Sequence, residues 1–116
     1  MIETPSSVIM IDQIVQHSDF ISIGTNDLIQ YLMAADRENQ SLAHYYEAGN
    51  RMVIEFLKQV LQSAKECGLE CTLCGELAGD LRFTEDLLDI GLRRFSVSPR
   101  LVHGLKEKLI SIAKRR

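Results

Sequence analysis

The sequence has 116 residues, 46% of them hydrophobic and 25% charged, which is the composition of one ordinary globular domain with enough apolar side chains for a core. Its 13 Lys and Arg residues against 16 Asp and Glu residues give a net charge of -3, which offers no electrostatic basis for binding nucleic acid or an anionic membrane. An odd count of 3 cysteines, with no leading signal segment and no apolar run near the ~20 residues of a membrane span, favours a cytoplasmic protein.

Along the chain, short apolar runs alternate with segments of helical periodicity, so the sequence predicts an α/β fold in which four strands alternate with helices. Glycine or proline follows each expected strand, and both residue types interrupt strands. In chain order we expect a strand at 1–5, a helix at 6–18, a strand at 19–23, a helix from 28 that becomes irregular by 46, a helix at 50–66, a strand at 70–74, a helix at 84–88, a strand at 94–98 and a helix at 101–116.

This alternation implies right-handed crossovers and parallel strands, so the carboxyl ends of all strands meet at one edge of the sheet. Enzymes of the α/β class place their sites at this edge. Polar side chains stand at the end of each expected strand: Glu3, Asn26 with Asp27, Cys74, and Ser96 with Ser98. We therefore expect these side chains to converge.

The chemistry of this set indicates a small anionic substrate. Glu3 and Asp27 suit Mg²⁺, which commonly takes one or two protein carboxylates and completes its shell with water and substrate oxygens. Arg37 offers a two-pronged donor for phosphate or carboxylate. Cys74 offers a proton donor or a nucleophile at the same edge. Together they indicate metal-assisted chemistry on a small phosphorylated acid.

Each of these side chains also has a purely structural interpretation. Glu3 can be a terminal or helix-entry carboxylate, Asp27 can cap the following helix, and Arg37 can pair with a surface acid. Zinc binding by Cys71 and Cys74 is disfavoured, because residues three apart on a strand face opposite ways and no second Cys or His pair follows.

Four ordered motifs are similar to those of a known family. They are Met-Ile-Glu-Thr-Pro at 1–5, Phe-Ile-Ser-Ile-Gly-Thr-Asn-Asp-Leu-Ile-Gln-Tyr at 20–31, Asp-Arg-Glu-Asn at 36–39 and Cys-Gly-Glu-Leu-Ala-Gly-Asp at 74–80. They closely resemble the phosphoenolpyruvate-binding barrel of enzyme I of the bacterial phosphotransferase system, a phosphoenolpyruvate-protein phosphotransferase. Phosphoenolpyruvate synthase and pyruvate phosphate dikinase belong to the same group of phosphoenolpyruvate-utilising enzymes and are the alternative.

The resemblance implies a role for each matched side chain. Glu3 and Asp27 would bind Mg²⁺, while Asn26, Asp27 and Arg37 would bind the substrate. Cys74 would protonate the enolate carbon once the phosphoryl group has left, which releases pyruvate. The phosphoryl group would pass to a histidine in an N-terminal domain that the sequence does not contain, and from there to a phosphocarrier protein of the sugar or the nitrogen branch.

Four strand and helix units make half of an eight-stranded barrel. We therefore expect residues 1–116 to be a single partial domain, the last half of a TIM-type (β/α)8 barrel, and a fragment of a longer protein. The isolated piece is expected to be inactive, because the strands that would carry other substrate arginines are absent. Open strand edges and an uncovered apolar inner face favour a homo-oligomer. The alternative is a stand-alone half-barrel without catalysis that serves as an oligomerisation or regulatory module.

Overall fold

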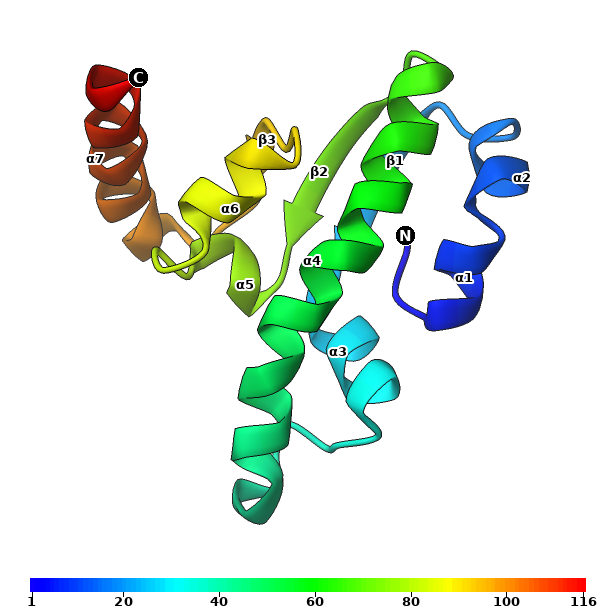
Figure 1. The fold of residues 1–116 in the computed structure, drawn as a ribbon, viewed down its shortest axis with the longest axis horizontal. Coiled ribbons are helices and arrows are strands. Elements are labelled where there is room, and N and C mark those ends of the chain that lie inside the picture. The colour runs from blue at the N-terminus through cyan, green and yellow to red at the C-terminus, as the bar shows by residue number, and fades with distance from the viewer.

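The computed structural model describes residues 1–116 and has an α/β architecture (Figure 1). Its sheet holds three parallel strands in the order β1-β2-β3: β1 (Phe20–Gly24), β2 (Glu70–Cys74) and β3 (Arg94–Phe95). The helices are α1 (Pro5–Ile9), α2 (Ile11–Val15), α3 (Thr25–Met33), the 3-10 helix η1 (Gln40–Leu42), α4 (Ala43–Glu66), α5 (Glu76–Gly79), α6 (Thr84–Asp89) and α7 (Pro99–Arg115). The predicted alternation of parallel strands with helices is confirmed.

The strands differ from the prediction in number and length. The first expected strand is reduced to an isolated parallel bridge between Ile2 and Ile23. Thr4 caps α1 and Pro5 occupies its first turn, so the chain leaves the sheet after Glu3. At the opposite edge β3 has two residues rather than the expected five. The structure thus has three strands and one bridge in place of the four expected strands.

Several helices also begin or end elsewhere than predicted. The single helix expected after the first strand is divided into α1 and α2 at Met10, whose φ of -91° and ψ of 12° interrupt the helical turn. Helix α3 begins at Thr25, directly after β1, and not at Leu28. Helix α4 begins at Ala43 and not at Asn50. The short helix α5, directly after β2, was not predicted.

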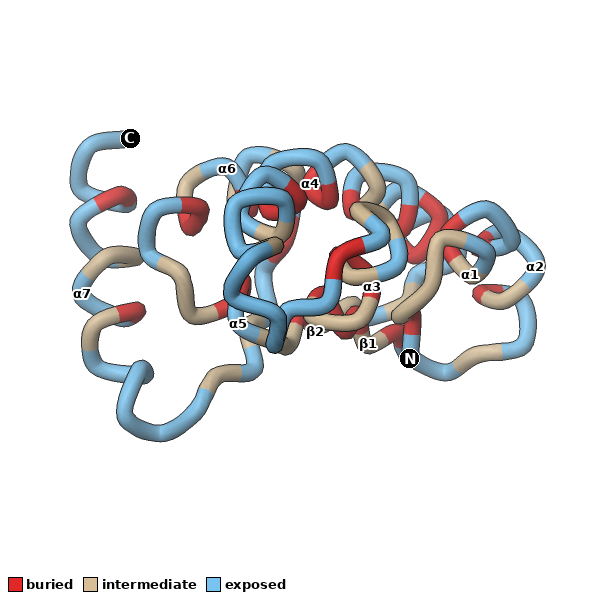
Figure 2. Tube along the Cα trace, turned by 90° about the horizontal axis from the view of Figure 1, so that it is seen from below, coloured by how far each residue is buried: buried red, intermediate tan, exposed pale blue.

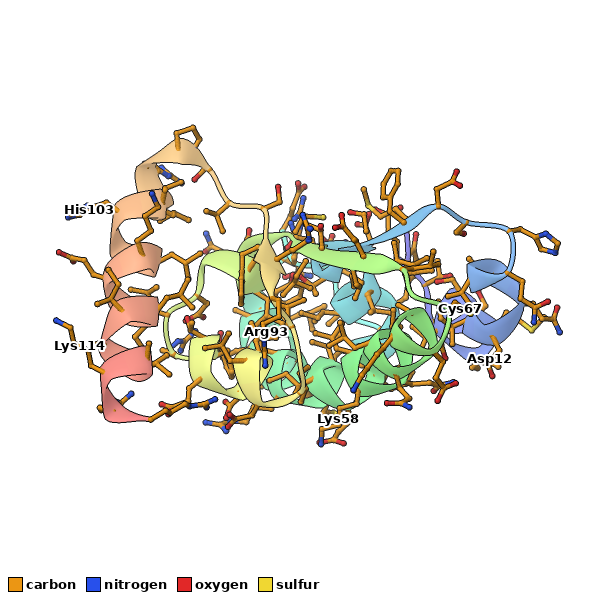
Figure 3. The ribbon with its side chains drawn as sticks, turned by 90° about the horizontal axis from the view of Figure 1, so that it is seen from above. Asp12, Lys58, Cys67, Arg93, His103 and Lys114 are labelled. Carbon is orange, nitrogen blue, oxygen red and sulfur yellow. The ribbon has the colours of Figure 1, made fainter.

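The helices α3, α4 and α6 form a layer on one face of the sheet (Figures 2 and 3). Because successive strand residues face opposite ways, Ile21, Ile23 and Leu73 all belong to the face that meets this layer. Each is buried, and they join a cluster of 19 buried apolar residues that includes Leu57 of α4 and Leu87 of α6. The burial of this face therefore holds the strands, and with them their carboxyl ends, against the helices.

The other face of the sheet has no helix layer over it, and its composition corrects the expectation of an apolar inner face. Phe20 is the large apolar side chain that the strands place on it, and it is 70% exposed. Ser22 and Thr72 share this face, and Glu70 forms an ion pair with Arg94 across it. This face is therefore largely polar.

Helix α7 lies apart from the sheet, at the end of the molecule next to α6 (Figure 1). Its basic end pairs with acids of α6, through Arg115 with Glu85 at 3.2 Å and through Arg116 with Asp89. His103 and Lys114 project from α7 on the side away from the sheet (Figure 3). None of the helices in residues 1–116 combines the length and the apolar character that crossing a membrane requires.

Candidate functional site

A small polar pocket of about 160 Å³ lies at the carboxyl ends of β1 and β2. Every residue selected from the sequence for binding or catalysis contributes to its wall, although only Cys74 lies on a strand and the other four lie on loops or in the first turn of α3. The lining residues are Met1, Glu3, Gly24, Asn26, Asp27, Arg37, Cys74 and Gly75. Ser96 and Ser98 do not line the pocket, and Ser98 is the N-cap of α7.

Glycine at the end of β1 allows Glu3 to reach the pocket. A Cβ atom at Gly24 would lie 2.9 Å from Glu3 Oε1 and 2.9 Å from Met1 Sδ, which is closer than van der Waals contact permits. Thr4, and not Glu3, caps the following helix α1, so the helix-entry interpretation of Glu3 is wrong. The Glu3 carboxylate therefore lies directly over the end of β1.

The ends of β1 and β2 are joined by side-chain hydrogen bonds at Gly75. Thr25 Oγ1 donates to the carbonyl of Cys74 at 3.1 Å, and Asn26 Oδ1 accepts from the backbone N–H of Glu76 at 2.9 Å. Gly75 has a φ of 91°, and a Cβ there would lie 2.7 Å from Thr25 Oγ1 and 3.0 Å from Asn26 Oδ1. A residue other than glycine would meet both a strained backbone and a steric conflict here.

Asp27 lies in the first turn of α3 and does not cap the helix. The N-cap is Gly24, and no side chain accepts from the first backbone N–H groups of α3. Asp27 Oδ1 instead accepts from Gln30 Nε2 at 3.1 Å. The interpretation of Asp27 as a helix cap is therefore wrong, and the amino end of α3 keeps its positive partial charge next to the pocket.

Arg37 lies on the exposed turn that follows α3. Its backbone N–H donates to Gln30 Oε1 at 3.0 Å. Its guanidinium forms none of the ion pairs found in the structure, so the interpretation of Arg37 as a surface ion-pair partner receives no support. Its positive charge acts to lower the pKa of Tyr46.

Tyr46 of α4 adjoins the pocket and was not predicted from the sequence. Its hydroxyl donates to the backbone carbonyl of Asn26 at 3.5 Å. Burial is the largest cause of the raised pKa of Tyr46, followed by the negative charge of Glu76, while the Arg37 guanidinium opposes this rise. The hydroxyl therefore stays protonated at neutral pH. The sequence from 28 to 46 is helical at first and then irregular and polar, and it carries no signal that brings Tyr46 to this edge of the sheet.

Cys74 ends β2 and is half-buried in the wall of the pocket. Its thiol donates to the carbonyl of Ile23 at 3.1 Å, and Ser22 Oγ lies 3.8 Å from the sulfur. A neutral thiol held by a backbone carbonyl is a proton donor placed beside the two carboxylates.

The donor set of the pocket fits a divalent cation with oxygen preference. No cluster of three or more His, Cys, Asp and Glu side chains suited to a metal occurs in residues 1–116. Mg²⁺ commonly takes one or two protein carboxylates and obtains its other oxygens from water and substrate phosphate. Glu3 and Asp27, which line the same small pocket, meet that requirement.

A larger hollow of about 410 Å³ lies at the amino ends of the strands, between α4 and the loop before β3. Three of its four cationic side chains, those other than Lys65, are already engaged within the protein. Lys58 pairs with Glu55 at 2.8 Å, Arg94 pairs with Glu70, and Arg93 donates to the carbonyls of residues 88 and 92 at 2.8 and 2.7 Å. The pocket at the carboxyl ends of the strands is the better candidate for a ligand site, because Glu3, Asp27 and Arg37 line the same small space.

Comparison with known proteins finds relatives that match nearly the whole chain. Residues 1–114 match the model of the family described as "PEP-utilising enzyme, PEP-binding domain". The chain is 46% identical over 107 residues to the phosphoenolpyruvate-protein phosphotransferase of Buchnera aphidicola subsp. Schizaphis graminum, covering 92% of this chain and 19% of the relative. It is 37% identical over 110 residues to that of Cupriavidus necator, covering 95% and 19%, and 40% identical over 114 residues to that of Geobacillus stearothermophilus, covering 98% and 20%. The chain thus spans about a fifth of the length of these curated relatives.

Proposed function

Because the chain belongs to the family of phosphoenolpyruvate-binding domains of phosphoenolpyruvate-utilising enzymes, we propose that its pocket binds phosphoenolpyruvate and takes part in phosphoryl transfer from it. The observation that carries the proposal is the presence of Glu3, Asn26, Asp27, Arg37 and Cys74 in one pocket. The relatives reported above are named as phosphoenolpyruvate-protein phosphotransferases, which favours this activity over that of a synthase or a dikinase.

The phosphate of the substrate would lie between Arg37 and the amino end of α3. The exposed guanidinium of Arg37 can donate two parallel hydrogen bonds to phosphate oxygens. The uncapped backbone N–H groups of α3 provide further donors, together with the positive end of the helix dipole. Asn26 lies in the first turn of α3, so its main chain belongs to this group of donors.

Glu3 and Asp27 would hold Mg²⁺ with their carboxylates. When bound, Mg²⁺ supplies positive charge that stabilises oxygens of the phosphate and of the developing enolate. The two carboxylates carry their own negative charge beside the substrate phosphate. This arrangement favours substrate binding only together with a cation, so we expect phosphoenolpyruvate binding to depend on Mg²⁺.

Cys74 would act as the acid in the second half of the reaction. Transfer of the phosphoryl group to a histidine breaks the bond between phosphorus and the enol oxygen and leaves the enolate of pyruvate. The thiol then gives its proton to the terminal enolate carbon, a C–H bond forms, and the thiolate recovers a proton from water. The hydrogen bond to Ile23 at 3.1 Å keeps the neutral thiol at the pocket wall before this step.

The remaining parts of the proposal concern the whole protein. The bridge at Ile2 and the three strands would be four consecutive strands of a TIM-type barrel, with the pocket at its carboxyl end. The acceptor histidine would belong to another domain and would pass the phosphoryl group to a phosphocarrier protein in the cytoplasm. The open edges of the sheet support pairing of two copies into a homo-oligomer.

A calorimetric titration tests the binding step. Phosphoenolpyruvate is titrated into the purified protein with and without Mg²⁺, and the same titration is repeated with Arg37→Ala. We expect binding only with Mg²⁺ and a Kd raised about 10-fold to 100-fold in the variant, because a hydrogen bond to a charged group contributes about 1.5–3 kcal/mol. Arg100→Ala, which removes an exposed arginine of α7, is the matched control. Absence of binding by the unaltered protein would favour the non-catalytic module instead.

A second experiment separates binding from proton transfer. In a protein that contains both this chain and the histidine domain, Cys74→Ala should abolish pyruvate formation while leaving the Kd for phosphoenolpyruvate within about 3-fold, because the thiol acts on the enolate carbon only. Cys67→Ala, at the exposed end of α4, should form pyruvate at the normal rate. Normal turnover by Cys74→Ala would exclude Cys74 as the acid.

A further inference from the structure

Gln30 occupies a position that connects two parts of the pocket, although it does not line the pocket itself. It is half-buried on α3, one turn after Asp27. Its side-chain nitrogen donates to Asp27 Oδ1 at 3.1 Å, and its side-chain oxygen accepts from the backbone N–H of Arg37 at 3.0 Å. One amide group therefore contacts both a carboxylate and the segment that carries the arginine.

The chemistry of the two partners determines how this amide is oriented. An ionised carboxylate only accepts hydrogen bonds, and a backbone N–H only donates. The nitrogen of Gln30 must therefore face Asp27 and its oxygen must face Arg37. A carboxylate at this position would repel Asp27, and an apolar side chain would bind neither partner. At three residues from Asp27 on the same helix, the amide of a glutamine side chain can form hydrogen bonds with both groups.

The segment that carries Arg37 depends strongly on this contact. Helix α3 ends at Met33 and its C-cap Ala34 has a left-handed φ of 49°, while the backbone N–H of Ala35 donates to the carbonyl of Gln30 at 3.1 Å. The chain then turns away from the helix, and Arg37 is exposed. The bond to the Gln30 side chain is the one hydrogen bond that the backbone of Arg37 forms. Removal of this bond frees the backbone of Arg37 from the helix.

The contact with Asp27 also affects the carboxylate itself. Because Gln30 donates to Oδ1, it limits rotation of the carboxylate and leaves Oδ2 as the oxygen without a hydrogen bond from Gln30. Groups that hydrogen-bond a metal-binding carboxylate in this manner change metal affinity by about 10-fold to 100-fold when they are removed.

We propose that Gln30 is a positioning residue that holds Asp27 and Arg37 in one fixed arrangement, so that a divalent cation and the substrate phosphate bind together. The inference rests on the proposed function of the pocket. Gln30 acts through its two partners and touches neither the cation nor the substrate. Its removal should weaken cation binding through Asp27 and phosphate binding through Arg37, and should reduce the degree to which each ligand strengthens the binding of the other.

The test uses Gln30→Met, which keeps an unbranched side chain of similar length and removes both hydrogen bonds. Calorimetry measures the Kd of Mg²⁺ alone, of phosphoenolpyruvate at saturating Mg²⁺, and of Mg²⁺ at saturating phosphoenolpyruvate. We expect the Kd of Mg²⁺ alone and the Kd of phosphoenolpyruvate each to rise about 10-fold. The Kd of Mg²⁺ at saturating phosphoenolpyruvate should rise by more than the Kd of Mg²⁺ alone, because the coupling between the two ligands is reduced. Gln62→Met is the matched control, because Gln62 of α4 also donates to a carboxylate one turn away, Glu66 Oε1 at 2.5 Å, outside the pocket. Its three Kd values should equal those of the unaltered protein.

A double-mutant cycle distinguishes positioning from a general effect on folding. If Gln30 acts on the cation through Asp27, then Gln30→Met in a background of Asp27→Asn should leave the remaining Mg²⁺ affinity unchanged. An equal loss in both backgrounds would overturn the inference. Gln30→Ala, which preserves the helix, replaces Gln30→Met if the latter does not fold.

The possible failures can be told apart. If the unaltered protein binds phosphoenolpyruvate and Gln30→Met binds it equally well, the inference about Gln30 is wrong and the proposed function stands. If the unaltered protein binds neither Mg²⁺ nor phosphoenolpyruvate, the proposed function is wrong and the inference fails with it.

Discussion

Replacing Gly75 by alanine tests how closely the ends of β1 and β2 are packed in the pocket. The backbone of Gly75 has a φ of 91° and a ψ of -179°, a region that is almost exclusive to glycine. The added Cβ would also lie 2.7 Å from Thr25 Oγ1 and 3.0 Å from Asn26 Oδ1. Thr25 is fully buried and both oxygens are engaged in hydrogen bonds, so neither can move without losing its partner.

Two costs add in Gly75→Ala. Backbone strain at such a φ and ψ costs about 1–3 kcal/mol, and forcing an extra carbon into a packed site costs about 1–3 kcal/mol more. We therefore expect the free energy of unfolding to fall by about 2–6 kcal/mol, a large part of the roughly 5–15 kcal/mol that stabilises a domain.

Gly91→Ala is the matched control, because Gly91 also has a positive φ, 100°, but a Cβ there would meet no atom within 4 Å. Urea denaturation followed by circular dichroism gives the free energy of unfolding of both variants. Gly75→Ala should be less stable than Gly91→Ala by about 1–3 kcal/mol, the cost of the steric conflict. Equal stability of the two variants would refute the packing described for Thr25 and Asn26.

Three further predictions concern the pocket, the core and the thiols. Gly24→Ala should weaken Mg²⁺ binding by about 10-fold in calorimetry, because the new Cβ would displace the Glu3 carboxylate, whose Oε1 would lie 2.9 Å away. The loss of stability should be small, since the atoms that must move belong to flexible side chains and not to the backbone. Unchanged Mg²⁺ affinity would argue against Glu3 as a ligand. Leu57→Ala, in the fully buried centre of α4, should lower the free energy of unfolding by about 2–5 kcal/mol in urea denaturation, and a loss below about 1 kcal/mol would contradict its place in the core. Burial raises the pKa of the Cys71 thiol to about 11, so its ionisation favours the unfolded state, and stability should decline as pH rises from the ordinary thiol pKa towards 11. Cys71→Ala should remove this part of the decline in denaturation at pH 8 and pH 10.5, whereas Cys67→Ala, at an exposed thiol, should not.

The start of α4 shows why some elements could not be located from the sequence. Asn50 is a residue type that often caps a helix, so the helix was predicted to begin there, yet Gly49 and Asn50 both lie inside α4 and are buried. A Cβ at Gly49 would lie 2.5 Å from Ile29 Cγ2 and 2.7 Å from Met33 Cγ, so glycine allows α3 and α4 to approach closely. Packing between the two helices outweighs the roughly 1 kcal/mol that glycine costs within a helix.

The residues of the pocket were largely predictable, whereas their roles are still proposals. Parallel strands bring their carboxyl ends to one edge, which is why Glu3, Asp27 and Cys74 converge as predicted. The same argument was wrong for Ser96 and Ser98, because β3 ends at Phe95 and Ser98 is the N-cap of α7. The positions of β1 and β2 agreed with the prediction because both are apolar runs interrupted by a glycine.

The sequence by itself determined the order of the helices and strands, the edge of the sheet at which polar side chains gather, and the family to which the chain belongs. These depend on local composition, on hydrophobic periodicity and on short motifs, all of which can be read along the chain. Only the tertiary structure decided that Tyr46 adjoins the pocket, that the first strand shrinks to a bridge at Ile2 and that Gln30 joins Asp27 to Arg37. These features depend on hydrogen bonds and packing between groups brought together by folding, and no local pattern encodes the distances between them.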